Sequence, residues 1–466
     1  MTDQLERLKA AVSPDDQRFV MFREIQSNGA GAMDRRGFIH ASAVALSGIA
    51  FRTVGQDQAS DWRVNGARVN QHLADLSRFG RNLEGGVSRV SFTQADIEGR
   101  AFTMDLMRAA GLDVRIDAVG NILGRREGML RDAPPILFGS HIDSVPGGGN
   151  YDGDVGSMSA IEVAHTLGER GYRNRHPLEV AIWCDEESGL TGSRGFIGEL
   201  TAADLRRIGR DGVALGDKIR RIGGDPDRLG DAAHEPGSVA AYVELHIEQG
   251  GVLDQSGIQI GIVEGIVSIN EYRVTITGFA NHAGTTPMDQ RRNALLAAAE
   301  LVQAVDRIVR AEPGRQVGTV GWMEVKPGAP NVVPGEVNLT VELRDLSMDK
   351  IELLWERIHS EALEIVQRHD TSFDSTLELS AQGALSDPAV RDVIVEATDF
   401  LGLTSRRMPS GAGHDAQDLA RICPMGMIFV PSVDGVSHSP REFTRPGDVE
   451  NGANVLLQTV VRLDRG

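Results

Sequence analysis

Four separate segments of the sequence carry side chains that can bind a cation or move a proton. Each segment follows a short apolar run, and each contains a histidine or a pair of carboxylates. The side chains are those of His141, Asp143, Asp152, Glu186, Glu187, His246 and His438. Imidazole and carboxylate groups are ligands of divalent ions such as Zn²⁺ and Mn²⁺. Three histidines with two carboxylates are sufficient for two such ions.

The adjacent carboxylates have a specific chemical implication. Glu186 and Glu187 repel each other when both are charged, and a cation beside them is a reason to hold both at one strand end. One of the pair can then bind the ion while the other transfers protons. Asp143 follows His141 by two residues, where its carboxylate can orient the imidazole.

Thiolate chemistry does not explain these segments. The chain has two cysteines, Cys184 and Cys423, and they do not form a C-x-x-C pair. Cys184 precedes the acidic segment, and we interpret it as a small buried apolar residue rather than as a nucleophile. Any bound metal therefore depends on histidine and carboxylate ligands.

The elements that must position these side chains alternate between helix and strand. Apolar periodicity predicts helices over 64–80, 93–111, 157–171 and 388–401. Short apolar runs predict strands over 112–123, 136–138, 178–184, 239–245 and 425–430. This order indicates an α/β domain with a mostly parallel sheet, in which ligands bind at the carboxyl ends of the strands.

A different order of elements interrupts this pattern. It predicts strands over 271–277, 316–325, 336–344 and 372–380, with helices over 291–311 and 348–368. The order β-α-β-β-α-β is typical of a ferredoxin-like sandwich. We therefore predict an α/β domain from residues 61–265 and 384–466, an inserted domain over 266–383, and a leader over 1–60.

Composition limits the possible partners. The 466 residues are enough for two domains, and 41% hydrophobic with 24% charged residues excludes a disordered chain and a multi-span membrane protein. The 48 basic and 66 acidic residues give a net charge of −18. This charge repels nucleic acid and anionic lipid. We expect a small-molecule substrate, no nucleic-acid partner and no stable insertion into a membrane.

The N-terminal segment resembles a twin-arginine export signal. Arg35 and Arg36 precede an uncharged run over 41–51, which is too short to span a bilayer. The arginine pair lies directly behind Met33, a possible start of translation. The sequence thus predicts export to the periplasm. The alternative is an ordinary amphipathic N-terminal helix on a cytoplasmic protein.

A set of sequence motifs carries a resemblance to a known family. They read G-S-H-I-D-S-V-P (139–146), D-E-E (185–187), E-L-H-I-E-Q-G (244–250), N-H-A-G-T-T-P-M (281–288), P-N-V-V-P-G (330–335), E-L-R-D (342–345), S-G-A-G-H-D-A (410–416) and G-V-S-H-S-P (435–440). From about residue 61 to its C-terminus, the chain resembles the di-metal amidohydrolases of the M20 metallopeptidase clan. Within that clan it is similar to the branch of N-carbamoyl-L-amino acid hydrolases, allantoate amidohydrolases and β-ureidopropionases.

The resemblance implies two divalent metal ions per subunit, Zn²⁺ or Mn²⁺, with Co²⁺ or Ni²⁺ as further possibilities. One ion is expected on His141, Asp152 and His246. The other is expected on Asp152, Glu187 and His438, so that Asp152 is shared. The resemblance also implies that the α/β domain is the catalytic domain and that the inserted domain is a lid and dimerisation domain, which forms a homodimer through an edge strand.

The same resemblance assigns roles in catalysis and substrate binding. Glu186 is expected to be the general base, and His282 of the inserted domain is expected to stabilise the oxyanion. The expected substrate-binding residues are Gln249, Asn331, Arg344 and His414, with Arg344 on the substrate carboxylate.

The implied reaction is hydrolysis of the ureido C–N bond of N-carbamoyl-L-amino acids or of ureido acids such as allantoate. It releases an amine product, carbon dioxide and ammonia. One alternative is an aminopeptidase or aminoacylase of the same clan, which cleaves peptide or acyl amides. A second alternative is a non-catalytic protein that binds amino-acid derivatives.

Overall fold

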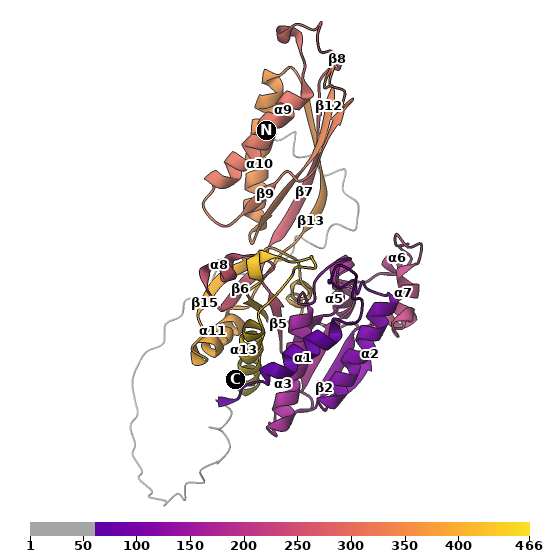
Figure 1. Cartoon of the computed structure of the whole chain (residues 1–466), viewed down its shortest axis with the longest axis vertical. Helices are drawn as coiled ribbons and strands as arrows, with labels where there is room; N and C mark the ends of the chain where they lie inside the picture. The colour runs from indigo at the N-terminus through magenta and orange to yellow at the C-terminus, as the bar shows by residue number, and fades with distance from the viewer. Residues whose placement is uncertain (1–60) are drawn as a thin grey trace, which may run out of the picture. The chain divides into compact units, whose positions relative to one another are not determined.

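The computed structural model describes residues 61–466 (Figure 1). They form a nine-stranded sheet, a five-stranded sheet and a two-stranded sheet, with helices against the two larger ones. The predicted leader and its twin-arginine segment lie outside the described residues. Within 61–466, every helix is too short or too polar to serve as a membrane span.

The nine-stranded sheet has a parallel centre. Its order is β1-β2-β4-β3-β5-β16-β6-β14, with β15 also paired to β6. The bounds are β1 Asp113–Ile116, β2 Ile122–Arg126, β3 Ile136–His141, β4 Leu178–Trp183, β5 Ala241–Ile247, β6 Ile260–Ile266, β14 Ala384–Leu385, β15 Ser405–Ser410 and β16 Met425–Val430. The pairs β4·β3, β3·β5 and β5·β16 are parallel. All four of these strands are buried along their whole length, as expected for a parallel sheet covered on both faces.

Long helices cover this sheet. They are α1 Gly66–Leu76, α2 Gln94–Ala109, α3 Asp154–Glu169, α11 Pro388–Phe400 and α13 Pro446–Arg465. Local sequence fixes where they begin: Thr93 accepts a hydrogen bond from the N–H of Asp96 at the start of α2, and Asp387 caps α11 ahead of Pro388. Helices α3 and α13 pack on β3 and β5 and on each other. This packing fixes the two strands that end in His141 and His246.

Shorter elements form the loops around the strand ends. They are α4 Glu186–Gly189, α5 Thr191–Phe196, α6 Ala202–Leu205, α7 Leu215–Arg221, η3 Pro226–Asp231, α8 Val252–Ser256, α12 Asp415–Leu419 and η5 Val433–Gly435. Helix α12 packs against β5 and β16 and contacts α5.

The five-stranded sheet is antiparallel and lies between β6 and β14 in the chain. Its elements are β7 Ser268–Thr277, α9 Ala294–Ala311, β9 Val317–Thr319, β10 Met323–Lys326, β12 Glu336–Asp345, α10 Met348–Arg368 and β13 Ser372–Ala381. The order β10-β12-β7-β13 and the β-α-β-β-α-β sequence confirm the predicted ferredoxin-like class. Figure 1 shows α9 and α10 side by side along this sheet, where they pack on β7 and β12. The domain boundaries at 266 and 384 stay a prediction.

Two predicted strands are wrong in detail. The run 112–123 is a hairpin of β1 and β2, because Asp117 Oδ1 accepts the N–H groups of Val119, Gly120 and Asn121 and turns the chain. The run 316–325 is divided into β9 and β10. Thr319 pairs with Glu342, and Met323 pairs with Leu339. The β9–β10 segment therefore has one residue more than the facing part of β12, which makes it a bulge.

Candidate active site

The carboxyl ends of the four central strands bring the predicted ligands together. His141 is the last residue of β3, and His246 is the second-last residue of β5. Glu186 and Glu187 begin α4, directly after β4, and His438 lies in the loop after β16. Because these strands are neighbours in the order β4-β3-β5-β16, side chains far apart in sequence meet at one edge.

One cluster consists of His141, Asp152 and His246, all buried. Asp152 Oδ1 lies 3.6 Å from His141 Nε2 and 3.1 Å from His246 Nε2, and the two Nε2 atoms are 3.5 Å apart. The Nδ1 atoms face backbone carbonyls, those of Asp143 and Ile247, each at 3.0 Å. With the proton on Nδ1 in each ring, both Nε2 lone pairs are available to one cation beside Asp152 Oδ1. This arrangement fits a metal ion held by two imidazoles and a carboxylate.

A second cluster consists of Asp152, Glu187 and His438. His438 Nε2 lies 3.3 Å from Asp152 Oδ2 and 3.4 Å from Glu187 Oε2. The other oxygen of Glu187 is buried and has no hydrogen-bond partner among the described residues. Asp152 therefore presents one oxygen to each cluster. The donor set and the orphaned carboxylate oxygen fit a second divalent ion.

The electrostatics of these carboxylates favour a bound cation. Burial, together with the nearby charge of Asp152, raises the pKa of Glu187 to about 7. Burial raises the pKa of Glu186 well above its ordinary value. Burial opposes the ionisation of Asp152 too, but His246, His141 and His438 together hold its pKa well below the ordinary value. A divalent cation would offset the cost of burying this negative charge.

Glu186 belongs to neither cluster but lies next to them. Its carboxylate is 3.8 Å from His141 Nε2. Asp143 fixes the backbone of the acidic pair, because its two oxygens accept the N–H groups of Glu186 and Glu187, each at 3.2 Å. Asp143 also accepts a 2.6 Å hydrogen bond from Ser91. Its carboxylate is 3.7 Å from His141 Nδ1, so its carbonyl oxygen, at 3.0 Å, is the nearer partner of that ring.

Glu442 is a site residue that the sequence reasoning missed. It is buried, and its Oε1 accepts the N–H groups of Tyr151 at 2.9 Å and Asp152 at 3.0 Å. Its Oε2 lies 3.1 Å from the hydroxyl of Ser437 and accepts the N–H of His438 at 3.2 Å. Glu442 thus joins the loop of Asp152 to the loop of His438. The one signal in the sequence that could have indicated Glu442 is its position four residues after the candidate ligand His438.

Two predicted substrate-binding residues lie beside the clusters. Gln249 has a left-handed backbone, with φ of 58°, and its Nε2 donates to Asp152 Oδ2 at 2.7 Å. Its Oε1 is buried without a hydrogen-bond partner among the described residues. His414 is buried behind His246, with ring centroids 4.4 Å apart, and its Nε2 lies 2.9 Å from Ser410 Oγ. Burial lowers the pKa of His414 well below its ordinary value, so its ring is neutral.

Arg344 lies at the base of the five-stranded sheet, opposite Ile269 at the start of β7. Its Nε and Nη2 donate to the two oxygens of Glu342 at 2.8 and 3.0 Å. Its Nη1 donates to the carbonyl of Gly411 at 2.7 Å. The guanidinium is therefore next to the 410–414 loop, and its fork is occupied by Glu342.

His282 and Asn331 lie elsewhere. His282 belongs to β8, Asn281–His282, which pairs with β11, Val332–Val333, and the carbonyl of Asn331 accepts the N–H of Ala283. The ten residues of β7 separate this tip from β6, a length of about 33 Å at 3.3 Å per residue. Within 61–466, no hydrogen bond or ion pair joins either side chain to the two clusters. The structure does not bring these two residues to the site.

The His282 ring is nevertheless held in one orientation. Its Nδ1 accepts the N–H groups of Gly284 at 3.0 Å and Thr285 at 3.2 Å. Nδ1 is thus an acceptor, and Nε2–H is left free to donate.

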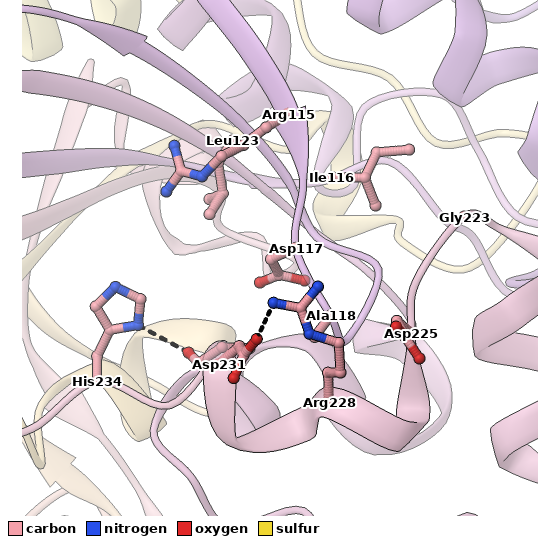
Figure 2. A pocket seen from close by; sticks show the side chains of 11 residues that line it. Arg115, Ile116, Asp117, Ala118, Leu123, Gly223, Asp225, Arg228, Asp231 and His234 are labelled. Carbon is pink, nitrogen blue, oxygen red and sulfur yellow. Dashed lines mark hydrogen bonds and ion pairs between the residues drawn. The ribbon is translucent and has the colours of Figure 1, made fainter.

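A cavity at the edge strands is separate from the clusters. It has a volume of about 260 Å³ and lies between the β1–β2 turn and η3. In Figure 2, Arg228 is directed toward Asp231, and the ring of His234 is bonded to the carbonyl of Ala232. None of the predicted site residues lines it.

Comparison with known proteins decides the family. Residues 137–462 match the family described as Peptidase family M20/M25/M40. The chain belongs to this family. The predicted resemblance is therefore confirmed, and the protein is an enzyme that hydrolyses amide-type C–N bonds.

Relatives in this family include enzymes with named substrates. The chain is 41% identical to the N-carbamoyl-L-amino acid amidohydrolase of Geobacillus stearothermophilus, over 86% of this chain and 100% of the relative. It is 33% identical to the allantoate amidohydrolase of Escherichia coli (strain K12), over 85% and 97%. A crystal structure of an amidase of the hydantoinase/carbamoylase family from Burkholderia multivorans superposes with a TM-score of 0.83, at 35% identity, over 87% of this chain and 99% of that one.

Proposed function

We propose that this enzyme hydrolyses the ureido C–N bond of N-carbamoyl-L-amino acids or of related ureido acids such as allantoate. The observation that carries the proposal is the pair of clusters that share Asp152, with the carboxylate of Glu186, which belongs to neither cluster, beside them. The names of the relatives, N-carbamoyl-L-amino acid amidohydrolase and allantoate amidohydrolase, support this substrate class.

His141 and His246 would hold one divalent ion with Asp152, and Glu187 and His438 would hold a second. When bound there, such ions polarise the carbonyl and make water more acidic. Glu186 accepts a proton from the attacking water, because its carboxylate is the one in the group that no cluster uses. Zn²⁺ or Mn²⁺ suits this set of imidazole and carboxylate donors.

The same Glu186 returns its proton to the leaving nitrogen. Water adds its oxygen to the ureido carbon, the C–N bond to the amino acid breaks, and the amine leaves with the proton. The other product is carbamate, which decomposes to carbon dioxide and ammonia. Gln249 Oε1, which has no hydrogen-bond partner among the described residues, is placed to accept an N–H of the ureido group.

Arg344 binds the α-carboxylate of the substrate with its planar fork. In the present arrangement Glu342 occupies that fork. The substrate carboxylate therefore replaces the carboxylate of Glu342 as the partner of Arg344 Nε and Nη2. The hydrogen bond from Nη1 to the carbonyl of Gly411 can remain.

We propose that the protein is a homodimer and that His282 and Asn331 act in the site of the partner subunit. The tip that carries them is about 33 Å of strand away from its own site, so hinge motion at the base of β7 does not deliver them. Strand β13 pairs only with β7 among the described strands, and its exposed Leu377 and Leu379 offer an edge for a second copy.

Complementation tests this assembly. Glu186→Gln and His282→Ala proteins should each be inactive as pure dimers. A 1:1 mixture that has exchanged subunits should regain up to a quarter of the native activity if the lid residue serves the partner's site, because half of its dimers are mixed and each mixed dimer has one intact site of two. No recovery on mixing, with dimers shown by light scattering, would contradict shared sites.

Export remains a separate proposal. Arg35 and Arg36 should direct the protein to the periplasm, and replacing both with lysine should retain it in the cytoplasm. Equal retention of the native and altered proteins would contradict it.

The proposed reaction is tested by ammonia release from N-carbamoyl-L-amino acids and allantoate, using metal-loaded protein. Dipeptides and N-acetyl amino acids, followed by amine release, test the alternative of an aminopeptidase or aminoacylase. Faster cleavage of the peptides or acyl amides than of every ureido compound would contradict the proposal.

A further inference from the structure

A cavity of about 550 Å³ adjoins the candidate active site and is not used by the catalytic residues above. Gln249, Gly411 and Ala412 line the side nearest the clusters. Gln249 donates to Asp152, and Gly411 accepts from Arg344, so a ligand of the metal cluster and the arginine proposed to bind the α-carboxylate each contact a residue of this lining. A substrate held by these groups directs its remaining atoms into the cavity.

The floor of the cavity is apolar. It is formed by Val252 at the start of α8 and by Met408 and Pro409 of β15. Val252 is 40% exposed, whereas Met408 is buried. These side chains can contact the methylene groups of a ligand.

Two arginines complete the lining. Arg315, which follows α9, forms an ion pair with Glu264. Arg406 lies on the same face of β15 as Met408, because the two are two residues apart in a strand. Within residues 61–466, the guanidinium of Arg406 has no hydrogen bond and no ion pair. The cavity thus contains a cation without a partner.

The acidic group in the lining, Glu248, is near enough to Arg406 for the two charges to attract each other, but its carboxylate is bonded elsewhere. Glu248 uses both carboxylate oxygens to accept the N–H groups of Val252 and Leu253, each at 2.7 Å, and no ion pair joins it to Arg406. The lining therefore combines apolar contacts with an unpaired guanidinium. An aliphatic chain that ends in an anion satisfies both.

We infer that this cavity binds the substrate's side chain and that Arg406 selects an acidic one. The preferred substrate class is then an N-carbamoyl derivative of an acidic amino acid, with Arg344 on the α-carboxylate and Arg406 on the side-chain carboxylate. This inference rests on the proposed ureido hydrolysis and adds the identity of the side chain to it.

The test compares N-carbamoyl-L-glutamate with N-carbamoyl-L-glutamine, which has nearly the same shape and no side-chain charge. The native enzyme should prefer the glutamate derivative about tenfold or more in kcat/KM, the effect of one charge-assisted hydrogen bond. Arg406→Gln should bring the ratio close to one. Arg406→Glu should invert it and should favour N-carbamoyl-L-ornithine over the glutamate derivative.

Arg407→Gln is the matched control. Arg407 is the next residue of the same strand, it is exposed on the other face, and it does not line the cavity. This variant should keep the native ratio. A similar loss of preference in both variants would mean that general surface charge attracts the substrate, and it would overturn the role of Arg406.

The outcomes separate the two proposals. Equal rates of the native enzyme on the two derivatives would overturn the side-chain assignment and leave ureido hydrolysis standing. A preference for glutamate that survives in Arg406→Gln would also overturn it. If metal-loaded protein hydrolyses no N-carbamoyl amino acid, the proposed function fails and this inference fails with it.

Discussion

Glu442 offers a sharp test of how the two clusters are held. Its four contacts tie the N–H groups of Tyr151 and Asp152 to the hydroxyl of Ser437 and the N–H of His438. In Glu442→Gln the shape is kept, but one oxygen becomes an NH₂ group. The lower-energy orientation directs this NH₂ toward Ser437, whose hydroxyl oxygen can accept it. The N–H of His438 then loses its acceptor.

The expected size of the effect follows from that one lost bond. An unsatisfied donor costs about 1 to 3 kcal/mol when it is buried, and the lower part of this range applies to the N–H of His438, which is part-buried. Part of that cost reaches the metal through the orientation of His438, and loss of such an outer partner typically lowers metal affinity about 10- to 100-fold. The second cluster, which contains His438, should therefore lose affinity by that factor. The first cluster does not contain His438 and should change less.

Calorimetric titration of the metal-free protein with Zn²⁺ should resolve this difference between the two sites. Glu450→Gln is the control. It also removes one negative charge, and Glu450 is exposed on α13. His438→Ala should abolish binding at the second site. Unchanged affinities in Glu442→Gln, with His438→Ala behaving as expected, would refute the bracing role. Equal weakening of both sites would refute the assignment of the lost bond to His438.

Three further predictions follow from single residues. Glu186→Gln should lower kcat at least about 100-fold, the low end for loss of a general base. Elemental analysis should find the same metal content as in the native protein, and a loss of metal would show that Glu186 is a ligand. Arg344→Lys should lower kcat/KM about 10- to 100-fold on N-carbamoyl amino acids, since lysine lacks the planar fork, but should have little effect on carboxamide analogues; equal losses would contradict carboxylate binding. Burial raises the pKa of Asp96 to about 6. Between about pH 4 and 6 the native state therefore keeps a proton that the unfolded chain releases, and the free energy of unfolding falls as the pH rises through this range. Asp96→Asn should therefore raise Tm above pH 6 and leave it unchanged below pH 4, and a Tm difference that does not vary with pH would contradict this cause.

The sequence predicted the parts of the fold that have strong local signals. Strand β16 and helix α10 have the predicted bounds, because an apolar run and a long amphipathic pattern each identify one element. Strand β15 was not predicted. It reads Ser-Arg-Arg-Met-Pro-Ser, without an apolar run, and its pairing with β6 comes from the tertiary fold.

The candidate ligands were predictable because each lies at the end of a buried parallel strand or in the loop that follows it. Strand order brings these ends together, and that order is consistent with the α/β pattern. Glu442 could not be found in this way. It follows no strand and acts through backbone N–H groups of a loop 290 residues earlier in the sequence, which side-chain types do not reveal.

The five-stranded sheet limits what any one chain can assemble. Arg344 pairs with Ile269 at the base of β7, whereas His282 follows Thr277 beyond its other end. Both residues lie in the predicted lid, but a ten-residue strand holds them about 30 Å apart in a packed sheet. A rigid lid that keeps Arg344 at the 410–414 loop cannot also place its own His282 there. If both residues act on one substrate, the His282 must come from a second copy, and this is why the assembly state and the catalytic roles have to be tested together.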